Sequence, residues 1–540
     1  MTEHQPAPAP GPSGASSGRA LSRRSLILRG GGLGVTALTM PWLLEACGKD
    51  SSSSTAGAAA IQPGGNLRAA LTGEPDSLDP AVSSIYTGAQ VYDNIFSKLL
   101  RFDPEGKFVG DLATKWTADD DKTWTFDLVD NATFHNGEKF TANDVKYTFD
   151  RILDPKTASA YAGLFASIDN VEVKSDTQVT FHLKTPFGPF LTNLANNGEI
   201  VNQKAIEAQD PARKPVGTGP FKFVEWVQGD HINLEKASSY HKEGLPHLNS
   251  VEFKFMLVDQ GRIDALSGGE LDWADAIPLQ QVATLSKDPR FTYKTSAVAG
   301  IPDFLALNTK KAPFDKLEVR QAIGWALDRE AIRSVAYSGT GEVGLEEVPS
   351  GSPWYDGQDF YEGGPDVAKA KQLLADAGYP NGLSVEYLGL PQYPELLKTG
   401  VTVADQLKAV GIDMKIKQVD VSVWFDAFSK GDYQITSAYQ ERTIDPDNFY
   451  ALVIRSGGPI NTTFYANPQV DKLIDQAAHM TDEDQRKALY TKIRGIVQEE
   501  APIIFVHFET IHYLMNKDVA GSEVTEALEL NFSDVGFTSS

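Results

Sequence analysis

Cysteine is almost absent from this chain of 540 residues, in which Cys47 is the only one. A single thiol excludes an internal disulfide bond and any zinc or iron–sulfur site built from several cysteines. Basic residues are also few: 49 Lys and Arg stand against 72 Asp and Glu, which gives a formal net charge of −23. This charge argues against sequence-independent binding to nucleic acid and against electrostatic docking on anionic lipid, because both depend on Lys and Arg.

The apolar stretch at residues 30–44 is too short to cross a membrane. It has about fifteen residues and contains Pro41, whereas a membrane-spanning helix needs about 20 apolar residues. Arg23 and Arg24 stand shortly before it, after a Pro- and Ser-rich start (residues 1–20) that we expect to be disordered. This order resembles a twin-arginine export signal with its apolar region, and a short amphipathic anchor helix is the alternative.

The cysteine directly follows this stretch, in the sequence Leu44-Glu45-Ala46-Cys47. The order resembles a bacterial lipobox, although Glu45 departs from the usual small or apolar residue at its position. Residues 47–60 are rich in serine and suit a flexible tether. The sequence therefore predicts a lipoprotein signal peptide over residues 1–46 and a lipid anchor on Cys47, which holds the mature protein on the outer face of the cytoplasmic membrane.

The remaining chain has the composition of a globular protein, and its length predicts two or three domains. Its first half is rich in strands. Residues 123–128 and 178–184 alternate polar and apolar side chains, which predicts half-buried strands. Thr141, with Asp144 three residues later, predicts the capped start of a helix. This half therefore indicates an α+β arrangement.

In the second half, helices and strands alternate. Residues 366–377 have the apolar spacing of a helix, and residues 383–390 have the pattern of a strand. The same order recurs over residues 404–419, where Gly411 ends the helix and a strand follows. The alternation predicts an α/β lobe over about 306–505.

A series of short segments runs in order through the chain: residues 92–100 (YDNIFSKLL), 110–113 (GDLA), 134–145 (FHNGEKFTANDV), 215–221 (PVGTGPF), 307–309 (LNT), 319–323 (VRQAI) and 445–449 (DPDNF). This ordered set resembles the family 5 extracellular solute-binding proteins of ABC importers, which include dipeptide-, oligopeptide- and nickel-binding proteins. The similarity extends over essentially all of residues 61–510. No single segment carries it alone.

The resemblance implies a two-lobed α/β fold of the periplasmic-binding-protein type (class II, cluster C), with an extra domain inserted in the first lobe. Lobe 1 is then expected over residues 61–305 with the insertion at about 100–214, lobe 2 over 306–505, and a return to lobe 1 over 506–540. The resemblance also implies a solute held between the lobes, an ABC permease and an ATPase as partners, no cofactor, and a monomer.

Arrangements typical of enzymes are missing from the expected folded part. The Gly-x-Ser-x-Gly match at residues 14–18 lies in the leader, and the chain has no GxxxxGK[ST] sequence, so ATP hydrolysis belongs to another subunit. No two histidines have the i, i+4 spacing of a helical zinc site. The sequence predicts neither an enzyme nor a metal site. We interpret the nearest histidine pairs and the acidic runs as solvated groups: His241/His247, His507/His512, Asp119-Asp120-Asp121, Glu346-Glu347 and Glu499-Glu500.

The solute site is expected just before the segment Asp445-Pro446-Asp447. In dipeptide- and oligopeptide-binding relatives an aspartate at that position pairs with the peptide's α-ammonium group, but here the position holds Arg442. Because a cation repels an ammonium group, either Glu441 takes its place or the solute is not a free peptide N-terminus. Arg442 could instead bind a carboxylate or phosphate, or it could pair with Asp445 or Asp447 and stiffen the loop.

Other candidate site residues follow from their family positions, and the two tryptophans among them could equally be core residues: Glu74, Asp76, Tyr86, Trp354, Trp424, Tyr439 and Asp445. The sequence therefore predicts an extracytoplasmic substrate-binding lipoprotein of an ABC importer that captures a peptide or peptide-like solute. The alternatives are a binding protein for a sugar, an opine or a metal chelate, a peptide-signal receptor on the same fold, and a secreted hydrolase.

Overall fold

The computed structural model describes residues 60–83, 85–104, 106–296, 300–441, 443–522 and 528–538. The predicted signal peptide, Cys47 and Arg442 lie outside the described residues. The chain divides into a unit of residues 1–58 and a unit of residues 59–540, and the following description concerns the second. None of its described helices combines the length and the apolar character that a membrane crossing requires.

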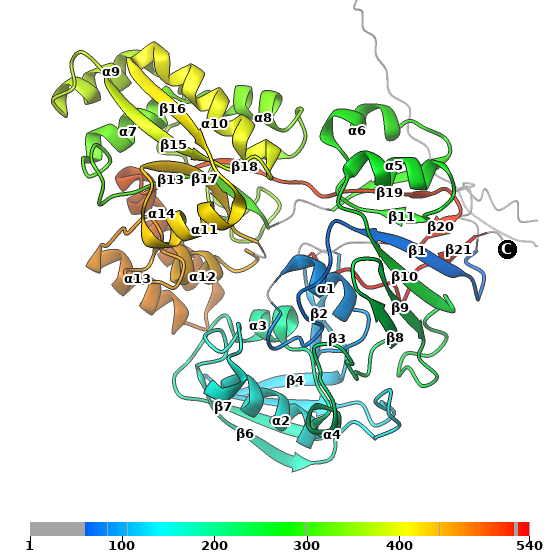
Figure 1. Ribbon diagram of the computed structural model, residues 1–540. Coiled ribbons are helices and arrows are strands. Elements are labelled where there is room, and N and C mark those ends of the chain that lie inside the picture. Colours follow the sequence, from blue (N-terminus) through cyan, green and yellow to red (C-terminus); the bar gives the residue numbers. More distant parts are fainter. Residues whose placement is uncertain are drawn as a thin grey trace, which may run out of the picture. The chain divides into compact units, whose positions relative to one another are not determined.

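This unit has mixed α/β structure, and Figure 1 shows its elements coloured along the sequence. The largest sheet of the described residues, called the β1 sheet, has the strand order β12-β19-β11-β1-β10-β9-β8. Its central strand β1 runs parallel to β10 and β11. The strands are β1 (Asn66–Leu71), β8 (Phe221–Val227), β9 (His231–Lys236), β10 (Ser250–Phe255), β11 (Trp273–Ala274), β12 (Phe291–Thr295) and β19 (His512–Asn516). Because β19 lies between β12 and β11, the C-terminal part of the chain belongs to the same sheet as β1.

Three helices accompany the β1 sheet in the chain: α1 (Tyr86–Tyr92), α5 (Asp259–Ser267) and α6 (Leu279–Leu285). Tyr92 on α1 packs in one apolar core with Trp273 of β11 and Phe253 of β10. Phe532, from the end of the chain, joins this core and stacks on Phe253 with ring centroids 5.8 Å apart. The C-terminal segment therefore completes the core that begins with β1.

A second sheet, called the β5 sheet, is antiparallel with the order β4-β5-β7-β6. It consists of β4 (Ala113–Asp120), β5 (Thr123–Leu128), β6 (Ile168–Ser175) and β7 (Gln178–Leu183), and it is packed by α2 (Ala142–Leu153). The predicted strands and the predicted helix start are confirmed, including reciprocal capping between Thr141 and Asp144. Phe149 of α2 meets Phe181 of β7 at 5.1 Å between ring centroids, which anchors the helix on the sheet.

A third sheet, called the β13 sheet, has the order β14-β18-β13-β17-β15-β16. Its strands are β13 (Pro302–Leu307), β14 (Glu342–Val343), β15 (Leu383–Gly389), β16 (Ile412–Gln418), β17 (Ile435–Tyr439) and β18 (Ile503–Phe508). β15 runs parallel to β16 and β17, whereas β13 is antiparallel to β17 and β18. The helices of this region are α7 (Leu317–Ala326), α8 (Arg329–Ala336), α9 (Val367–Asp376), α10 (Pro394–Leu407), α11 (Val421–Lys430), α12 (Pro446–Phe449), α13 (Pro468–Ala478) and α14 (Glu483–Glu500).

The predicted helix–strand alternation of this region is confirmed. Asp366 caps α9 by accepting a hydrogen bond from the Lys369 amide, and β15 follows. After α10, Gly411 adopts a φ of 88° at the end of a short 3-10 turn, and β16 begins at the next residue. A left-handed conformation of this kind costs glycine little, which explains why it ends the helical segment.

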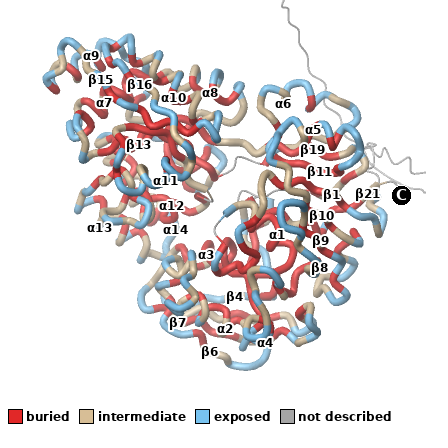
Figure 2. Tube along the Cα trace, in the orientation of Figure 1, coloured by how far each residue is buried: buried red, intermediate tan, exposed pale blue. Residues whose placement is uncertain are grey.

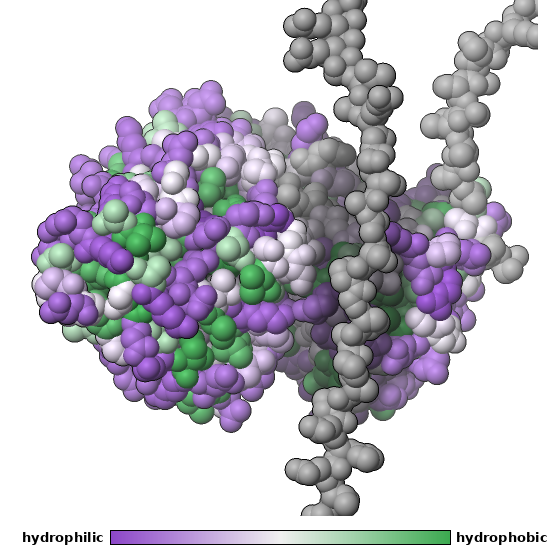
Figure 3. All heavy atoms as spheres, turned by 90° about the horizontal axis from the view of Figure 1, so that it is seen from above, coloured by the Kyte–Doolittle hydropathy of each residue, from purple (hydrophilic) through white to green (hydrophobic). Residues whose placement is uncertain are grey.

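The remaining described elements are short: β2 (Leu100–Phe102), β3 (Phe108–Gly110), α3 (Phe190–Asn197), α4 (Gln203–Ala208), β20 (Val519–Ala520) and β21 (Gly536–Phe537). Figure 2 shows that buried residues concentrate along the sheet strands and the helices packed on them. In Figure 3, most of the coloured side chains on the visible face are hydrophilic, as the large net charge suggests, with apolar patches between them.

Two crossover segments connect the β1 sheet with the β13 sheet. One runs from the end of β12 at Thr295 to the start of β13, and the other is the short segment 509–511 between β18 and β19. The Ser296 amide donates to the Ile511 carbonyl at 3.0 Å, and the Glu509 amide donates to the Ile301 carbonyl at 3.3 Å. The two crossovers are therefore hydrogen-bonded to each other at Ser296 and at Ile301.

The interpretation of Glu346 and Glu347 as solvated surface is wrong. Both side chains are fully buried around Arg494 of α14, which is itself inaccessible to solvent. The Arg494 Nε donates to Glu347 at 3.0 Å, and the Tyr450 hydroxyl donates to the same carboxylate at 2.6 Å. Charged groups are buried where they are paired, and a pair of adjacent acidic residues in the sequence does not reveal a partner almost 150 residues away.

The interpretation of His507 and His512 as solvated is also wrong. His507 lies in β18 and stacks on Tyr337 with ring centroids 3.6 Å apart, and burial lowers its pKa to about 3. His512 begins β19 and lies 2.6 Å from the Tyr293 hydroxyl through Nδ1, and burial lowers its pKa to about 4. Both rings are neutral near pH 7, and strand burial rather than metal binding accounts for them.

Candidate functional site

The ends of three strands meet at one edge of the β13 sheet. In the strand register Asp303 of β13 faces Tyr439 of β17 on one side and His507 of β18 on the other. The chain direction then places Asp303, Tyr439 and Glu509 at the same edge, because β13 begins where its antiparallel neighbours end. This edge is also the point from which both crossover segments leave the sheet.

The β1 sheet presents polar groups where its strands enter the crossovers. Asp275 follows β11 directly, and its carboxylate accepts a hydrogen bond of 2.6 Å from the Gln90 side chain of α1. Both residues are buried, and burial raises the pKa of Asp275 to about 6. Tyr513 of β19 is also buried, and burial, followed by the charges of Tyr86 and Asp275, raises its pKa.

A small apolar cluster at the crossovers unites two of the predicted site residues. Ile301 and Leu528 are its buried members, and Tyr86, Tyr439 and Ile511 pack against them. Tyr86 begins α1, whereas Tyr439 ends β17, so the cluster joins elements that lie more than 300 residues apart in the sequence. We call this cluster, with the polar groups Asp275, Asp303 and Glu509 beside it, the crossover site.

The crossover site is acidic. Burial and the charge of Glu509 raise the pKa of Asp303 well above its ordinary value. Burial and the charges of Glu395 and Glu441 raise the pKa of Glu509 to about 7. Carboxyl groups in such surroundings share protons near neutral pH, and they can accept hydrogen bonds from ammonium or amide groups or donate one when protonated.

Asp445 has a structural partner that the sequence analysis did not single out. Its buried carboxylate receives two hydrogen bonds from Arg486 of α14, at 2.9 and 2.8 Å, and a third from the Asp447 amide. Asp445 thus caps α12 and fixes the end of the segment that follows Tyr439. Burial and the charge of Asp445 raise the pKa of Asp447 to about 7.

The candidate site residues Glu74 and Asp76 lie in the loop after β1 and fix its position by hydrogen bonds. Glu74 accepts hydrogen bonds from the Trp226 indole nitrogen at 2.8 Å and from the Gly229 amide at 3.1 Å. Asp76 accepts one of 2.6 Å from the Ser83 hydroxyl. These contacts tie the loop after β1 to the β8–β9 hairpin and to the start of α1.

The two candidate tryptophans pack in the core of the β13 sheet region. Trp424 stacks on Phe428 at 4.4 Å between ring centroids, and its indole nitrogen donates to Thr436 at 3.0 Å. Trp354 lies under the Arg486 guanidinium, whose central carbon is 4.8 Å from the ring centroid. In this conformation neither indole belongs to the apolar cluster of the crossover site.

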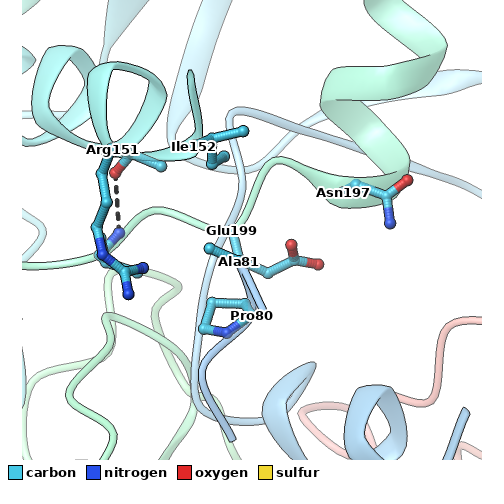
Figure 4. A pocket seen from close by; sticks show the side chains of 8 residues that line it. Pro80, Ala81, Arg151, Ile152, Asn197 and Glu199 are labelled. Carbon is cyan, nitrogen blue, oxygen red and sulfur yellow. Dashed lines mark hydrogen bonds between the residues drawn. The ribbon is translucent and has the colours of Figure 1, made fainter. Parts of the chain in front are cut away.

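The pocket in Figure 4 lies away from the crossover site, between α2, the end of α3 and Pro80-Ala81. It has no room for a water molecule, so it cannot hold a solute in this conformation. A second pocket of about 420 Å³ is an open depression beside β4 and β5, lined by Thr114, Leu128, Val129, Asp130, Asn131 and Thr177. Buried solute sites are mostly apolar and enclosed, so neither pocket is a strong candidate.

No set of three or more His, Cys, Asp or Glu side chains in the described ranges is arranged to hold a metal ion. Asp275, Asp303 and Glu509 were missed in the sequence. Asp303 lies within an apolar strand, and Asp275 and Glu509 directly follow one, which is a usable signal of a buried charge.

Comparison with known proteins identifies the family of the chain. The model of "Bacterial extracellular solute-binding proteins, family 5 Middle" matches residues 107–460. The probable D,D-dipeptide-binding periplasmic protein DdpA of Escherichia coli K12 is 30% identical over 482 residues, covering 85% of this chain and 92% of DdpA. The glutathione-binding protein GsiB of Pectobacterium atrosepticum is 29% identical over 491 residues, covering 86% and 92%.

Solved structures show the same similarity. The binding protein AgaA of A. tumefaciens R10, in complex with agropinic acid, is 31% identical with a TM-score of 0.76, covering 88% of this chain and 99% of AgaA. DppA of Helicobacter pylori, in complex with the peptide STSA, is 26% identical with a TM-score of 0.78 and the same coverage. These relatives are solute-binding proteins and not enzymes, and their fold has two lobes. The chain belongs to the bacterial extracellular solute-binding proteins of family 5.

Proposed function

We propose that this protein captures a peptide or peptide-like solute at the crossover site and delivers it to an ABC permease. The observation that carries the proposal is the packing of Tyr86 and Tyr439 in one cluster beside Asp275, Asp303 and Glu509. Tyrosine rings supply apolar area with a polar tip, and carboxyl groups supply acceptors for amide and ammonium groups. Peptides and glutathione in relatives such as DppA and GsiB support this solute class.

A second candidate solute is an opine-like organic anion. AgaA, whose structure holds agropinic acid, matches this chain at 31% identity. Arg442 stands where peptide-binding relatives have an aspartate, and a guanidinium group suits a carboxylate. If the solute is such an anion, Arg442→Ala should weaken its binding about ten- to a hundredfold, and Arg442→Lys should recover part of the loss.

The cellular setting of the proposal comes from the sequence. Residues 1–46 serve as a lipoprotein signal peptide, Cys47 carries the lipid, and residues 47–60 are the tether. Lobe 1 covers residues 61–305 with an inserted domain at about 100–214, lobe 2 covers 306–505, and residues 506–540 return to lobe 1. The family resemblance implies solute capture outside the membrane by a monomer and transfer to an ABC permease with its ATPase.

Native mass spectrometry of the purified chain tests the solute class, because a retained solute adds its own mass. Titration calorimetry with glutathione, the peptide STSA and agropinic acid then separates the two candidates. Tyr439→Ala should weaken binding of the accepted solute at least tenfold, whereas Phe425→Ala, which removes an exposed ring on α11, should leave it unchanged. Absence of a co-purified solute together with no binding of the three probes would refute the proposal.

A further inference from the structure

The loop between β7 and α3 contacts the α13–α14 junction. The Gly188 amide of this loop donates a hydrogen bond of 2.9 Å to the carbonyl of Ala478, the last residue of α13. The loop belongs to the β5 sheet region, whereas α13 and α14 accompany the β13 sheet. The hydrogen bond therefore joins the β5 sheet region to the β13 sheet region.

Gly188 fits this contact because it lacks a side chain. A Cβ atom placed there would lie 2.4 Å from the Met480 carbonyl oxygen and 2.6 Å from the Arg486 Nε. Carbon atoms do not approach that closely, and the Met480 oxygen is backbone that cannot swing aside. Gly188 is not among the glycines with positive φ, so its own backbone would accept alanine wherever the contact is absent.

Apolar packing reinforces the same contact from the other side. Ile444, which precedes α12, packs against the apolar core of the β5 sheet region, together with Phe187 from the Gly188 loop. Arg486, which a Cβ at position 188 would strike, is held by two hydrogen bonds to Asp445. Asp445 ends the segment that begins at Tyr439 of the crossover site, so the contact is linked to that site through one short stretch of chain.

We propose that Gly188, Ala478, Met480, Arg486 and Ile444 form a closure contact that retains the solute without touching it. This proposal rests on the proposed function, because the solute that the contact retains is the one bound at the crossover site. A solute that binds the closed state has an apparent affinity that scales with the closed fraction. Gly188 is thus a positioning residue: alanine at this place disfavours closure and leaves each separate region intact.

Hydrogen exchange tests the contact in the solute-free full chain. After correction for intrinsic rates, the amide at position 188 should exchange about tenfold faster in Gly188→Ala than in the wild type. Gly163→Ala is the matched control, because Gly163 lies in the same region, has an ordinary φ and has nothing within 4 Å of the added Cβ. A wild-type rate in Gly188→Ala, with melting temperature unchanged, argues against the contact.

Solute release tests the function of the contact. With the solute identified by native mass spectrometry, Gly188→Ala should release it roughly tenfold faster than Gly163→Ala, while both variants keep the wild-type melting temperature without solute. Ile444→Ala should also release the solute faster than its control, Val423→Ala, which lies on the exposed face of α11. In the double variant of Gly188 and Ile444, the change in the free energy of solute retention should be smaller than the sum of the two single changes, because both substitutions weaken one contact.

The two proposals fail in distinguishable ways. If the wild type binds no solute, the proposed function fails and the exchange experiment alone decides whether the contact exists. If the wild type binds its solute and both Gly188→Ala and Ile444→Ala release it at the wild-type rate, the closure contact is overturned and the proposed function stands. Should Gly188→Ala unfold early, Ile444→Ala carries the same test from the opposite side of the contact.

Discussion

Some buried acids in this protein are paired with a buried cation, as the Arg486–Asp445 pair shows. The two side chains are 4% and 2% exposed, and the Asp445 oxygens are occupied by the guanidinium and by the Asp447 amide. Asp445 therefore acts on the neighbouring loop by fixing its end. Arg494 is paired in the same way with Glu347, whereas burial raises the pKa of the adjacent Glu346 to about 8.

Replacing Arg486 with leucine should destabilise the fold by about 3–5 kcal/mol, because the buried Asp445 carboxylate loses its counter-charge. The free energy of unfolding in urea measures the effect. Arg290→Leu is the matched control, since Arg290 pairs with Asp288 at the exposed surface, and it should change stability little. If both variants lost equally little unfolding free energy, the result would contradict the structural role of the Arg486–Asp445 pair.

Titration of Glu509 should be visible in the pH dependence of stability. Its folded pKa of about 7 lies above the ordinary value of 4.5, so between these limits the folded state binds more protons than the unfolded state. Stability from this group is therefore present below pH 4.5 and is lost as the pH rises towards 7.

Glu509→Gln should remove that loss, so the difference in unfolding free energy between the variant and the wild type should grow from pH 4.5 to 7 in favour of the variant. The neutral His507 and His512 act in the opposite direction below pH 6.5, but they are common to both proteins and cancel in the difference. A pH-independent difference would show that Glu509 titrates normally.

At the scale of helices and strands, local patterns were sufficient for prediction. Thr141 and Asp144 form the capping box that their spacing indicates, and Gly411 ends its helical segment where the apolar pattern changes period. Strand partners were not predictable in the same way. β19 lies between β12 and β11, and this pairing depends on contacts over more than 200 residues that no local pattern encodes.

Gly411→Ala should cost about 1 kcal/mol of unfolding free energy, because alanine must adopt the φ of 88° found there. The nearest atom to the added Cβ is 3.5 Å away, so the cost is conformational and not a clash. Gly163→Ala, at an ordinary φ in open space, is expected to be neutral or slightly stabilising. Chemical denaturation of the two variants measures the difference, and equal stabilities would speak against a strained conformation at position 411.

At the scale of the whole molecule, the ordered family segments were enough to predict a two-lobed α/β binding protein, and the comparisons show it. The site was harder to predict. Tyr86 and Tyr439 do come together, but Asp303 and Glu509 gain their significance only through the β-sheet register and the hydrogen-bonded crossovers. A sequence shows that a residue is acidic, whereas its burial and its neighbours are properties of the folded chain.

The proposed lipid anchor makes membrane attachment depend on one atom, the sulfur of Cys47, since the chain contains no other cysteine. A lipid joined by a thioether bond cannot form on alanine, so Cys47→Ala should move the protein from the membrane fraction to the soluble fraction. Immunoblots of the two fractions after ultracentrifugation measure the shift, and Ser53→Ala in the tether is the control that should remain membrane-bound. Export itself is tested separately: if the twin-arginine interpretation holds, lysine at positions 23 and 24 should block it, whereas unchanged secretion would indicate the general secretory route. A Cys47→Ala protein that still sediments with membranes, together with a wild type whose mass shows no lipid, would mean that the anchor lies elsewhere.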